Sequence, residues 1–492
     1  MTQQVNRVYV GGGYSSSQLI WLIPIVDGYC QKQQINRIIF EKKIPEYILN
    51  NNIIEPILYR YNIVFLKNNL VYKNIFFLIK FFLENLLKIF FYSLILNRKK
   101  LLNQNYSWYK IQIFHSIWDT SFFYLKDGEL NPSFYSRTKA AFRVYYNIFC
   151  ALLLKKYNTK TIFVTHCVYT HRALVATLRN YNVKIINCDT NCTVFIQPNK
   201  KDLAWNMPNK NIVEKFSNKF FFNLSDKYWR SRIQGLGNYE DAQIALKGRK
   251  INNEIYPNVI MMHIFRDSPF NIIDRSRIFA DYIDWIYNTL KIIENSKEKW
   301  LIKGHPNFKR WGENSEITFN NIYNKIIKDK KNNIKFSLEK ISNIDLLKNT
   351  KRLVTFSGTA HLEFACLGRK PVVISKCTLD YFDKTSVLKP KNISEYKNFL
   401  LDNSDSNYFL LDDAKKEKAK FFLYLRENII NFRRELKCIS VYRNDNQKYI
   451  KKNLMNLKKN LNKNKKYLSI LGEMLKYNTF NAVTKKFVSK FY

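Results

Sequence analysis

Residues 352–375 read RLVTFSGTAHLEFACLGRKPVVIS, and this stretch decides the fold. An apolar, strand-like run ends at Ser357-Gly358-Thr359, a helix-forming run starts immediately, and a second apolar run follows at 370–375. Strand, helix and strand in this order form the repeating unit of a parallel sheet with helices on its faces. The stretch therefore predicts part of a doubly wound α/β domain.

The same alternation continues on both sides of this stretch. In the second half of the chain, strands are expected at 258–263, 299–306 and 333–337, and helices at 279–293 and 341–349. In the first half, strands are expected at 7–10, 35–40, 61–66, 110–115, 159–166 and 183–187, and helices at 74–98, 134–155 and 170–180. A chain of 492 residues is too long for one ordinary core.

We therefore expect two Rossmann-like α/β domains that face a cleft, with helices at the carboxyl end. The predicted boundaries are an N-terminal domain at 1–195, an irregular linker at 196–255, a C-terminal domain at 256–410, and helices with a basic tail at 411–492. The linker is assigned from its polar composition and scattered prolines.

The net charge of +42 suits a phosphate-rich partner: a nucleic acid, an anionic membrane, or nucleotide-sugar and lipid-diphosphate substrates. The excess of Lys, Asn and Ile is equally well explained by AT-rich codons. The sequence contains no RNP-type aromatic motif, zinc-finger spacing or basic zipper. We therefore predict no nucleic-acid partner.

Eight cysteines are scattered without a CxxC pair, which is typical of reduced thiols. Cys188 and Cys192 with His166 and His171 match no usual ligand spacing, so no metal site is predicted. The polar start MTQQVNRVYVGGG does not resemble a secretory signal, and we expect a cytoplasmic protein.

The most apolar stretch, 74–96, contains Lys80, Glu84 and Lys88. Three charges make a membrane span improbable and favour an amphipathic helix that is buried or lies on a membrane surface. With the basic tail from Lys451 to Lys490, this helix predicts peripheral association with the inner face of the cytoplasmic membrane.

Ser357-Gly358-Thr359 joins a strand end to a helix start, where free N–H groups and the helix dipole favour an anion. Two hydroxyls and a glycine there suit a nucleotide-sugar phosphate, and Glu363, one turn later, could accept ribose hydroxyls. The alternative is a plain N-cap with Glu363 on a solvated face.

Lys303-Gly304-His305-Pro306 also ends a predicted strand, where open α/β sheets bind ligands. His305 could donate to a phosphate while Pro306 fixes the turn. Another strand end carries His263 and Asp267, which could line the same cleft or serve as a packed histidine and a helix cap.

Asp119, expected in a loop after the strand at 110–115, is the first candidate for the base that deprotonates an acceptor hydroxyl. An Asx-turn is the alternative. His166, His171 and Arg172 follow the next strand of that domain and are candidates for acceptor binding.

The runs HIFRDSP, FADYIDWIYNTL and WLIKGHPN, followed by FSGTAHLEFACLGRKPVVISKCTLDYF, resemble bacterial capsule and lipopolysaccharide polysaccharide-biosynthesis proteins. These include Kdo-transferase-like enzymes and, more distantly, sialyltransferases and glycerophosphotransferases with an HP motif. The resemblance covers 258 to about 400 well and 105–190 more loosely.

This resemblance implies the two-Rossmann-domain GT-B fold, a nucleotide-sugar donor, and neither a cofactor nor a metal. It places Glu363 near the nucleotide, and it places five residues at the donor phosphate: His305, Pro306, Ser357, Gly358 and Thr359. The Ser-Ser/Thr signature of the sialyltransferase-like group is Ser-Gly-Thr here, so a CMP-linked or a UDP-linked donor stays open.

Three functions are compatible with these residues. The first is a glycosyltransferase that moves a sugar, CMP-Kdo-like in one version, to a glycan or lipid-linked glycan of a capsule or lipopolysaccharide. The second is a polyol-phosphate transferase with a CDP-activated donor. The third is a non-catalytic basic scaffold bound to a membrane.

Overall fold

A computed structural model describes residues 6–429 and Met455, except for the gaps at 12–15, 51, 53, 104, 166, 189–193, 197–218, 236–255, 268–277, 306–307, 309–311, 328–332, 340, 376 and 402–408. Two of the predicted site residues, His166 and Pro306, and the predicted basic tail from Lys451 to Lys490 therefore lie outside the described residues.

The first half is built on a six-stranded sheet of order β3-β2-β1-β4-β5-β6. The first five strands are parallel, and β6 pairs antiparallel with β5. This is the Rossmann order, in which strands are added on one side of β1 up to β3 and then on the other side from β4, so the strand order reverses between β1 and β4. The strands are β1 (Arg7–Gly11), β2 (Arg37–Phe40), β3 (Asn62–Phe65), β4 (Thr159–Val164), β5 (Lys184–Cys188) and β6 (Val194–Ile196).

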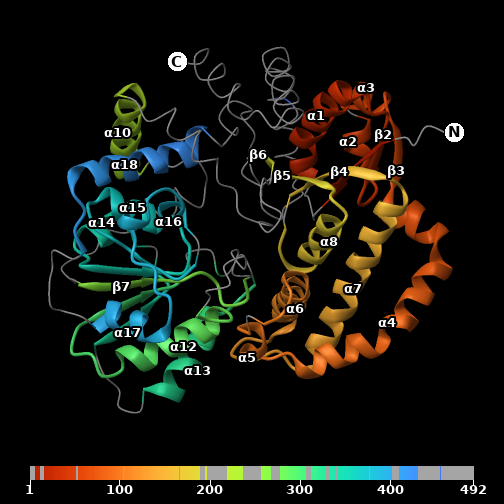
Figure 1. Cartoon of the computed structure of the whole chain (residues 1–492). Coiled ribbons are helices and arrows are strands. Elements are labelled where there is room, and N and C mark those ends of the chain that lie inside the picture. Colours follow the sequence, from red (N-terminus) through yellow and green to blue (C-terminus); the bar gives the residue numbers. More distant parts are fainter. Residues whose placement is uncertain are drawn as a thin grey trace.

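Helices pack around this sheet (Figure 1). The short ones are α2 (Glu46–Leu49), α3 (Glu55–Leu58), a π-helical turn at Leu66–Val71, α5 (Arg98–Leu101) and a 3-10 turn at Phe122–Tyr124. The longer ones are α1 (Ser16–Gln33), α4 (Ile75–Ile95), α6 (Trp108–Ser121), α7 (Phe134–Lys156) and α8 (Tyr169–Asn180). The helices predicted at 74–98, 134–155 and 170–180 are confirmed.

The strand predicted at 110–115 is wrong, because these residues belong to helix α6. Every residue from Ile111 to Ser121 is buried, yet polar residues recur among them at helical spacing (Gln112, His115, Ser116 and Asp119), a pattern that the strand prediction overlooked. The local signal was the start of the helix: the Ser107 side chain accepts a hydrogen bond from the Lys110 amide, as an N-cap does. Asp119 consequently lies in a helix and not in a loop.

The second half is built on a five-stranded parallel sheet of order β11-β10-β7-β8-β9. If these strands are numbered from β7 in chain order, their order is the same as that of the five parallel strands in the other sheet. The strand order reverses between β7 and β10. The strands are β7 (Asn258–Met261), β8 (Trp300–Lys303), β9 (Ile334–Ser337), β10 (Arg352–Thr355) and β11 (Val372–Val373). The stretch at 352–375 forms the predicted strand, helix and strand.

The helices of this half are α12 (Tyr282–Ile293), α13 (Ser315–Ile326), α14 (Asn343–Lys348), α15 (Ala360–Cys366), α16 (Thr378–Phe382), α17 (Ile393–Leu401) and α18 (Asp413–Tyr424), with a 3-10 turn at Lys384–Ser386 and a π-helical turn at Leu425–Ile429. Helix α10 (Lys219–Ile233), from the predicted linker, shares a buried cluster with α18 through Phe221, Trp229 and Phe421. The architecture is thus α/β, with two Rossmann-ordered sheets.

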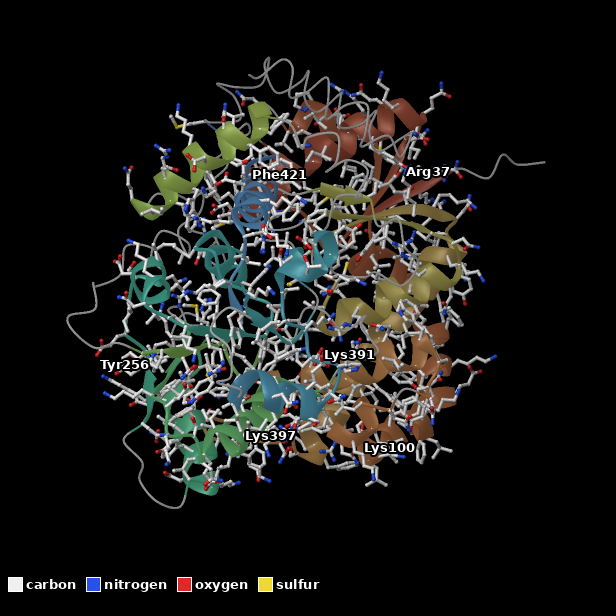
Figure 2. The ribbon with its side chains drawn as sticks, turned by 60° about the vertical axis from the view of Figure 1, so that its left-hand side comes forward. Arg37, Lys100, Tyr256, Lys391, Lys397 and Phe421 are labelled. Carbon is white, nitrogen blue, oxygen red and sulfur yellow. The ribbon has the colours of Figure 1, made fainter. Side chains whose placement is uncertain are left out.

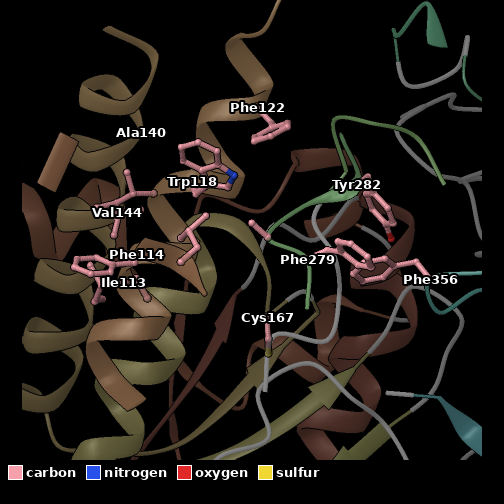
Figure 3. Close-up of a cluster of buried hydrophobic side chains, with 14 of the residues drawn as sticks. Ile113, Phe114, Trp118, Phe122, Ala140, Val144, Cys167, Phe279, Tyr282 and Phe356 are labelled. Atoms are coloured by element: carbon pink, nitrogen blue, oxygen red, sulfur yellow. The ribbon is translucent and has the colours of Figure 1, made fainter. Parts of the chain in front are cut away.

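Buried apolar side chains join the two halves into one cluster (Figure 3). Trp118 and Phe122 come from the first half, whereas Phe279, Tyr282 and Phe356 come from the second. The contact therefore excludes water from this part of the junction and stabilises the packing of the two halves.

Asp281 provides a polar anchor at the same junction. Its Oδ2 accepts hydrogen bonds from Arg98 Nε at 2.9 Å and from Trp118 Nε1 at 3.0 Å, both in the first half. Its Oδ1 accepts from the Asp284 amide at 2.7 Å and so caps α12. One buried carboxylate thereby fixes the start of α12 against the first half.

Candidate active site

Three neighbouring strands of the second sheet end in polar residues. His305 follows β8, His263 follows β7, and Ser357 follows β10. Parallel strands lie about 4.8 Å apart, so the outer two of these three ends are separated by roughly 10 Å across the sheet. This edge includes the point where the strand order reverses, which is where open α/β sheets bind ligands.

His305 is placed by Gly304 and surrounded by ring systems. A Cβ atom at Gly304 would clash with the Leu338 side chain, so a larger residue here would require that side chain to move. The His305 and His263 rings have centroids 4.8 Å apart. Burial and the neighbouring His263 lower the pKa of His305 to about 3. The imidazole is therefore neutral near pH 7 and can donate one N–H to an anionic oxygen.

His263 lies between an aromatic ring and a carboxylate. Its ring stacks on Tyr282 at 5.8 Å between centroids, and its Nδ1 is 2.9 Å from Asp267 Oδ2. The other carboxylate oxygen of Asp267 accepts a hydrogen bond from the Tyr169 hydroxyl. Because Tyr169 belongs to the first half, this group of three side chains spans the two halves. Asp267 is 7% exposed, so its charge acts in a medium with little screening.

Tyr169 has φ 52°, a left-handed conformation that is rare for a bulky side chain. Three residues later in α8, Arg172 donates to Asp119 of α6 at 2.9 Å, and both side chains are at most 2% exposed. The ring of Phe123 lies 4.4 Å from that of Tyr169. The surroundings of α8 thus hold Tyr169 in its strained conformation, facing Asp267.

Asp119 and Arg172 are therefore not in the positions that the sequence indicated. A carboxylate buried against a guanidinium is poorly suited to accept a substrate proton, because the ion pair stabilises its charged form. Burial lowers the pKa of Arg172, and the charge of Asp119 opposes this shift. The pair supports α8, whose first residue is Tyr169, and is not itself exposed to an acceptor.

The Ser357-Gly358-Thr359 loop leaves its polar groups at the sheet edge. All three residues are partly exposed, and the Thr359 side chain makes no capping hydrogen bond to α15. Among the described residues, a Cβ atom at Gly358 would meet only Thr355 Oγ1 within 4 Å, at 3.4 Å, so these residues leave room beside the Gly358 backbone. Thr359 therefore does not act as a plain N-cap of α15, which was the alternative interpretation of this loop.

Glu363 and Lys303 are buried behind this loop and do not reach the open space. Glu363 accepts from Arg232 of α10 at 2.6 Å, with side chains 3% and 1% exposed, so it does not lie on a solvated face. Lys303 Nζ donates to Ile341 O at 2.9 Å and to Asn343, which in turn donates to Glu363 at 3.3 Å. Burial lowers the pKa of Lys303 to about 8.

His171 belongs to another group, at the carboxyl edge of the first sheet. Its Nε2 lies 3.5 Å from Glu41 Oε1, and Lys67 binds the same carboxylate at 3.0 Å. Burial alone would raise the pKa of Glu41, but the two basic groups hold it below its usual range. Glu41 comes directly after a predicted strand, which was the signal that sequence reasoning missed.

Within the described part of the chain, no group of three or more His, Cys, Asp and Glu side chains is arranged to hold a metal ion. His263 contacts both His305, through its ring, and Asp267, at 2.9 Å, so the three side chains form one polar group.

No family model matches the chain, and no curated protein matches it. Among solved structures it is similar to KpsC of Thermosulfurimonas dismutans, a beta Kdo 2,4 transferase, with 11% identity over 54% of this chain and 79% of that one and a TM-score of 0.35. It is also similar to the UDP-GlcNAc 2-epimerase of Methanocaldococcus jannaschii in complex with UDP-GlcNAc and UDP (12% identity, 84% and 97% coverage, TM-score 0.27).

A glycosyltransferase of Rickettsia africae matches at 10% identity over 88% of this chain and 97% of that one, with a TM-score of 0.27. Superposition at these TM-scores is loose. What this chain binds or transfers has to be inferred from its own residues.

Proposed function

We propose that the protein is a glycosyltransferase that moves a sugar from a nucleotide-activated donor to a hydroxyl of a surface glycan, of the capsule or lipopolysaccharide kind. One observation carries the proposal. The ends of β8, β7 and β10 present His305, His263 and Ser357 at the reversal point of a Rossmann-ordered sheet, and Tyr169 of the other half bonds to Asp267 beside them.

The donor phosphate lies against His305 and the Ser357–Thr359 loop in this proposal. Breaking the bond between the anomeric carbon and the phosphate oxygen leaves negative charge on the nucleotide. Fixed donors at that position stabilise it more in the transition state than in the ground state. His305 contributes an N–H without a competing positive charge, and Ser357 and Thr359 contribute hydroxyls.

The acceptor hydroxyl forms the new bond to the anomeric carbon and must lose its proton. We assign this proton to His263, since Asp267, at 2.9 Å from Nδ1, would stabilise the resulting imidazolium. Tyr169 orients Asp267 from the first half. His263 and Asp267 take the role that the sequence assigned to Asp119, and the base becomes complete only when the halves meet.

For the donor we propose a nucleotide sugar, with CMP-Kdo as the first compound to test and a CDP-linked polyol as the competing one. For the acceptor we propose a glycan or lipid-linked glycan at the inner face of the cytoplasmic membrane. The net charge of +42 supports an anionic surface as a further partner. None of the described helices is long and apolar enough to cross a bilayer.

Removing the phosphate contacts tests the proposal. His305→Ala, and Ser357→Ala combined with Thr359→Ala, should each lower turnover by about 10²–10³-fold, as loss of one preorganised donor at a developing charge does. Turnover is measured as nucleotide release and by mass spectrometry of products, with a panel of nucleotide sugars, CDP-linked polyols included. Asp267→Asn should lower turnover, because it removes the carboxylate that would stabilise the imidazolium of His263.

Asp412→Ala is the matched control, since Asp412 caps α18 through the Lys415 amide and its other side-chain contact in the described part of the chain is an ion pair with the Lys415 side chain at 3.3 Å. It should lower the free energy of unfolding slightly and leave turnover per folded molecule unchanged. If the His305 and Ser357–Thr359 variants behave like this control, the phosphate site lies elsewhere. Transfer of a polyol phosphate and of no sugar would favour the competing donor.

A further inference from the structure

Helix α4 presents a continuous apolar ridge to solvent. Phe76 is 85% exposed, Leu83 69%, Leu87 83% and Leu94 68%. Their spacing of seven, four and seven residues places them on one line along the helix. Phe81, Ile89 and Ser93 lie on the opposite face and are buried. The inward face of α4 therefore provides its packing against the core. In the described part of the chain, the exposed ridge adds no buried contact that would stabilise the fold.

The ridge is broadened by neighbouring apolar side chains. Helix α4 itself adds the exposed Ile75, Phe77, Ile79, Phe90 and Phe91, and α7 adds Phe134 and Tyr135. The Arg137 side chain of α7 donates to Ser93 O at 2.7 Å, which places the start of α7 at the end of α4. A monomeric protein rarely exposes an apolar patch of this kind unless it binds something.

Lysines border this ridge. Lys73 precedes α4, Lys80 and Lys88 lie along one side of it, and Lys99 and Lys100 follow its end; all five are exposed. Glu84 is the acidic residue between them and lies 3.9 Å from Lys80. Figure 1 shows α4 along the outer side of the first half, away from the second half, and Figure 2 shows Lys100 at the lower rim of the molecule.

We propose that α4 is a membrane-docking helix, whose ridge enters the acyl boundary of an anionic bilayer while its lysines bind lipid headgroups. An apolar face of Phe and Leu with lysines beside it is the pattern of a helix lying in the interface plane. A second copy of the chain is disfavoured as the occupant because two chains of net charge +42 repel each other, whereas an anionic bilayer attracts both.

This inference rests on the proposed function, because docking by α4 would serve to hold the protein beside a lipid-linked acceptor. Binding to lipid can nevertheless be measured without any donor or acceptor, so the two proposals can fail separately. With α4 flat on the surface, the second half, which lies on the far side of the first half from α4 in Figure 1, is held away from the bilayer.

Co-sedimentation of the full chain with vesicles tests the docking. Vesicles of phosphatidylglycerol and phosphatidylcholine should bind the protein, and vesicles of phosphatidylcholine alone should bind it much less. Leu83→Glu with Leu87→Glu should weaken binding to the anionic vesicles by about 100-fold or more, since it removes two leucines that would insert into the bilayer and adds two negative charges. Both positions are exposed, so the variant should melt like the parent.

The control is Tyr59→Glu with Leu410→Glu, two exposed apolar residues (81% and 47%) that lie outside α4. It makes the same change in charge and should bind the anionic vesicles within about twofold of the parent. Equal binding by the α4 variant and this control would overturn the proposal, as would a parent that does not bind. An α4 variant that instead loses a dimer seen without vesicles by ultracentrifugation would make the ridge a contact between copies.

Discussion

In the first half of the protein, the strand order β3-β2-β1-β4-β5 places Glu41, Lys67 and His171 at one sheet edge, where they pair with each other. In the second half, the same order places His263 and His305 at the corresponding edge, beside an open loop. Equal topology therefore gives two different surfaces. The second is the proposed site of the donor phosphate, whereas the polar groups of the first pair with one another.

Each half also contains a buried ion pair, and these two pairs resemble each other more than the two sheet edges do. Asp119 binds Arg172 in the first half, and Glu363 binds Arg232 in the second, each pair at most 3% exposed. Each pair joins two helices and lies near a residue or loop of the candidate site. Such pairs hold geometry, because breaking one leaves a charge without a partner in a poorly solvated place.

The largest expected effect tests whether the two pairs are equivalent. Arg172→Met and Arg232→Met should each lower the free energy of unfolding by about 3–5 kcal/mol, because a buried carboxylate loses its partner. Urea unfolding followed by circular dichroism measures this. Adding Asp119→Leu or Glu363→Leu, respectively, should recover much of the loss. Arg172→Met that stays fully stable but inactive would restore Asp119 as a catalytic candidate.

An intermediate effect concerns acid. His305 and His361 of the second half both have pKa values lowered to about 3, mainly by burial, from an ordinary value of 6.5. As the pH falls, the two histidines are therefore protonated in the unfolded chain before they are protonated in the folded chain. The free energy of unfolding consequently decreases as the pH drops from 6.5 towards 3. Each histidine should contribute a slope of about 1.4 kcal/mol per pH unit in that window. His361→Asn should reduce the slope measured by urea unfolding between pH 4 and pH 7; an unchanged slope would mean that His361 is charged when folded.

The smallest effect is expected where the halves touch at their surface. Arg266 pairs with Asp127 at 2.5 Å, and the Asp127 side chain is 38% exposed. Arg266→Ala should change the free energy of unfolding by at most about 1 kcal/mol, because solvent screens an exposed pair. Differential scanning calorimetry should still show one transition. Two separate transitions would mean that this contact, and not the apolar cluster, couples the halves.

Much of the fold follows from local pattern. Apolar runs that end in polar residues located the strands β7, β8 and β10, and with them His263, His305 and Ser357. This works because the carboxyl ends of parallel strands meet at one edge of the sheet whatever the loops do. The amphipathic character of α4 is local for the same reason, since helical spacing alone aligns its apolar residues.

The tertiary structure decided the rest, because it depends on partners that are distant in the chain. Glu363 is a buried ion-pair member because Arg232, 131 residues away, packs onto it, and Tyr169 reaches Asp267 across 98 residues. Asp119 lies in a helix and not in the predicted loop, and its partner Arg172 is 53 residues away in the chain. The sequence by itself determined which residues stand at strand ends and which face of α4 is apolar. Long-range packing determined which charges are buried, with which partners, and therefore which residues remain available to a substrate.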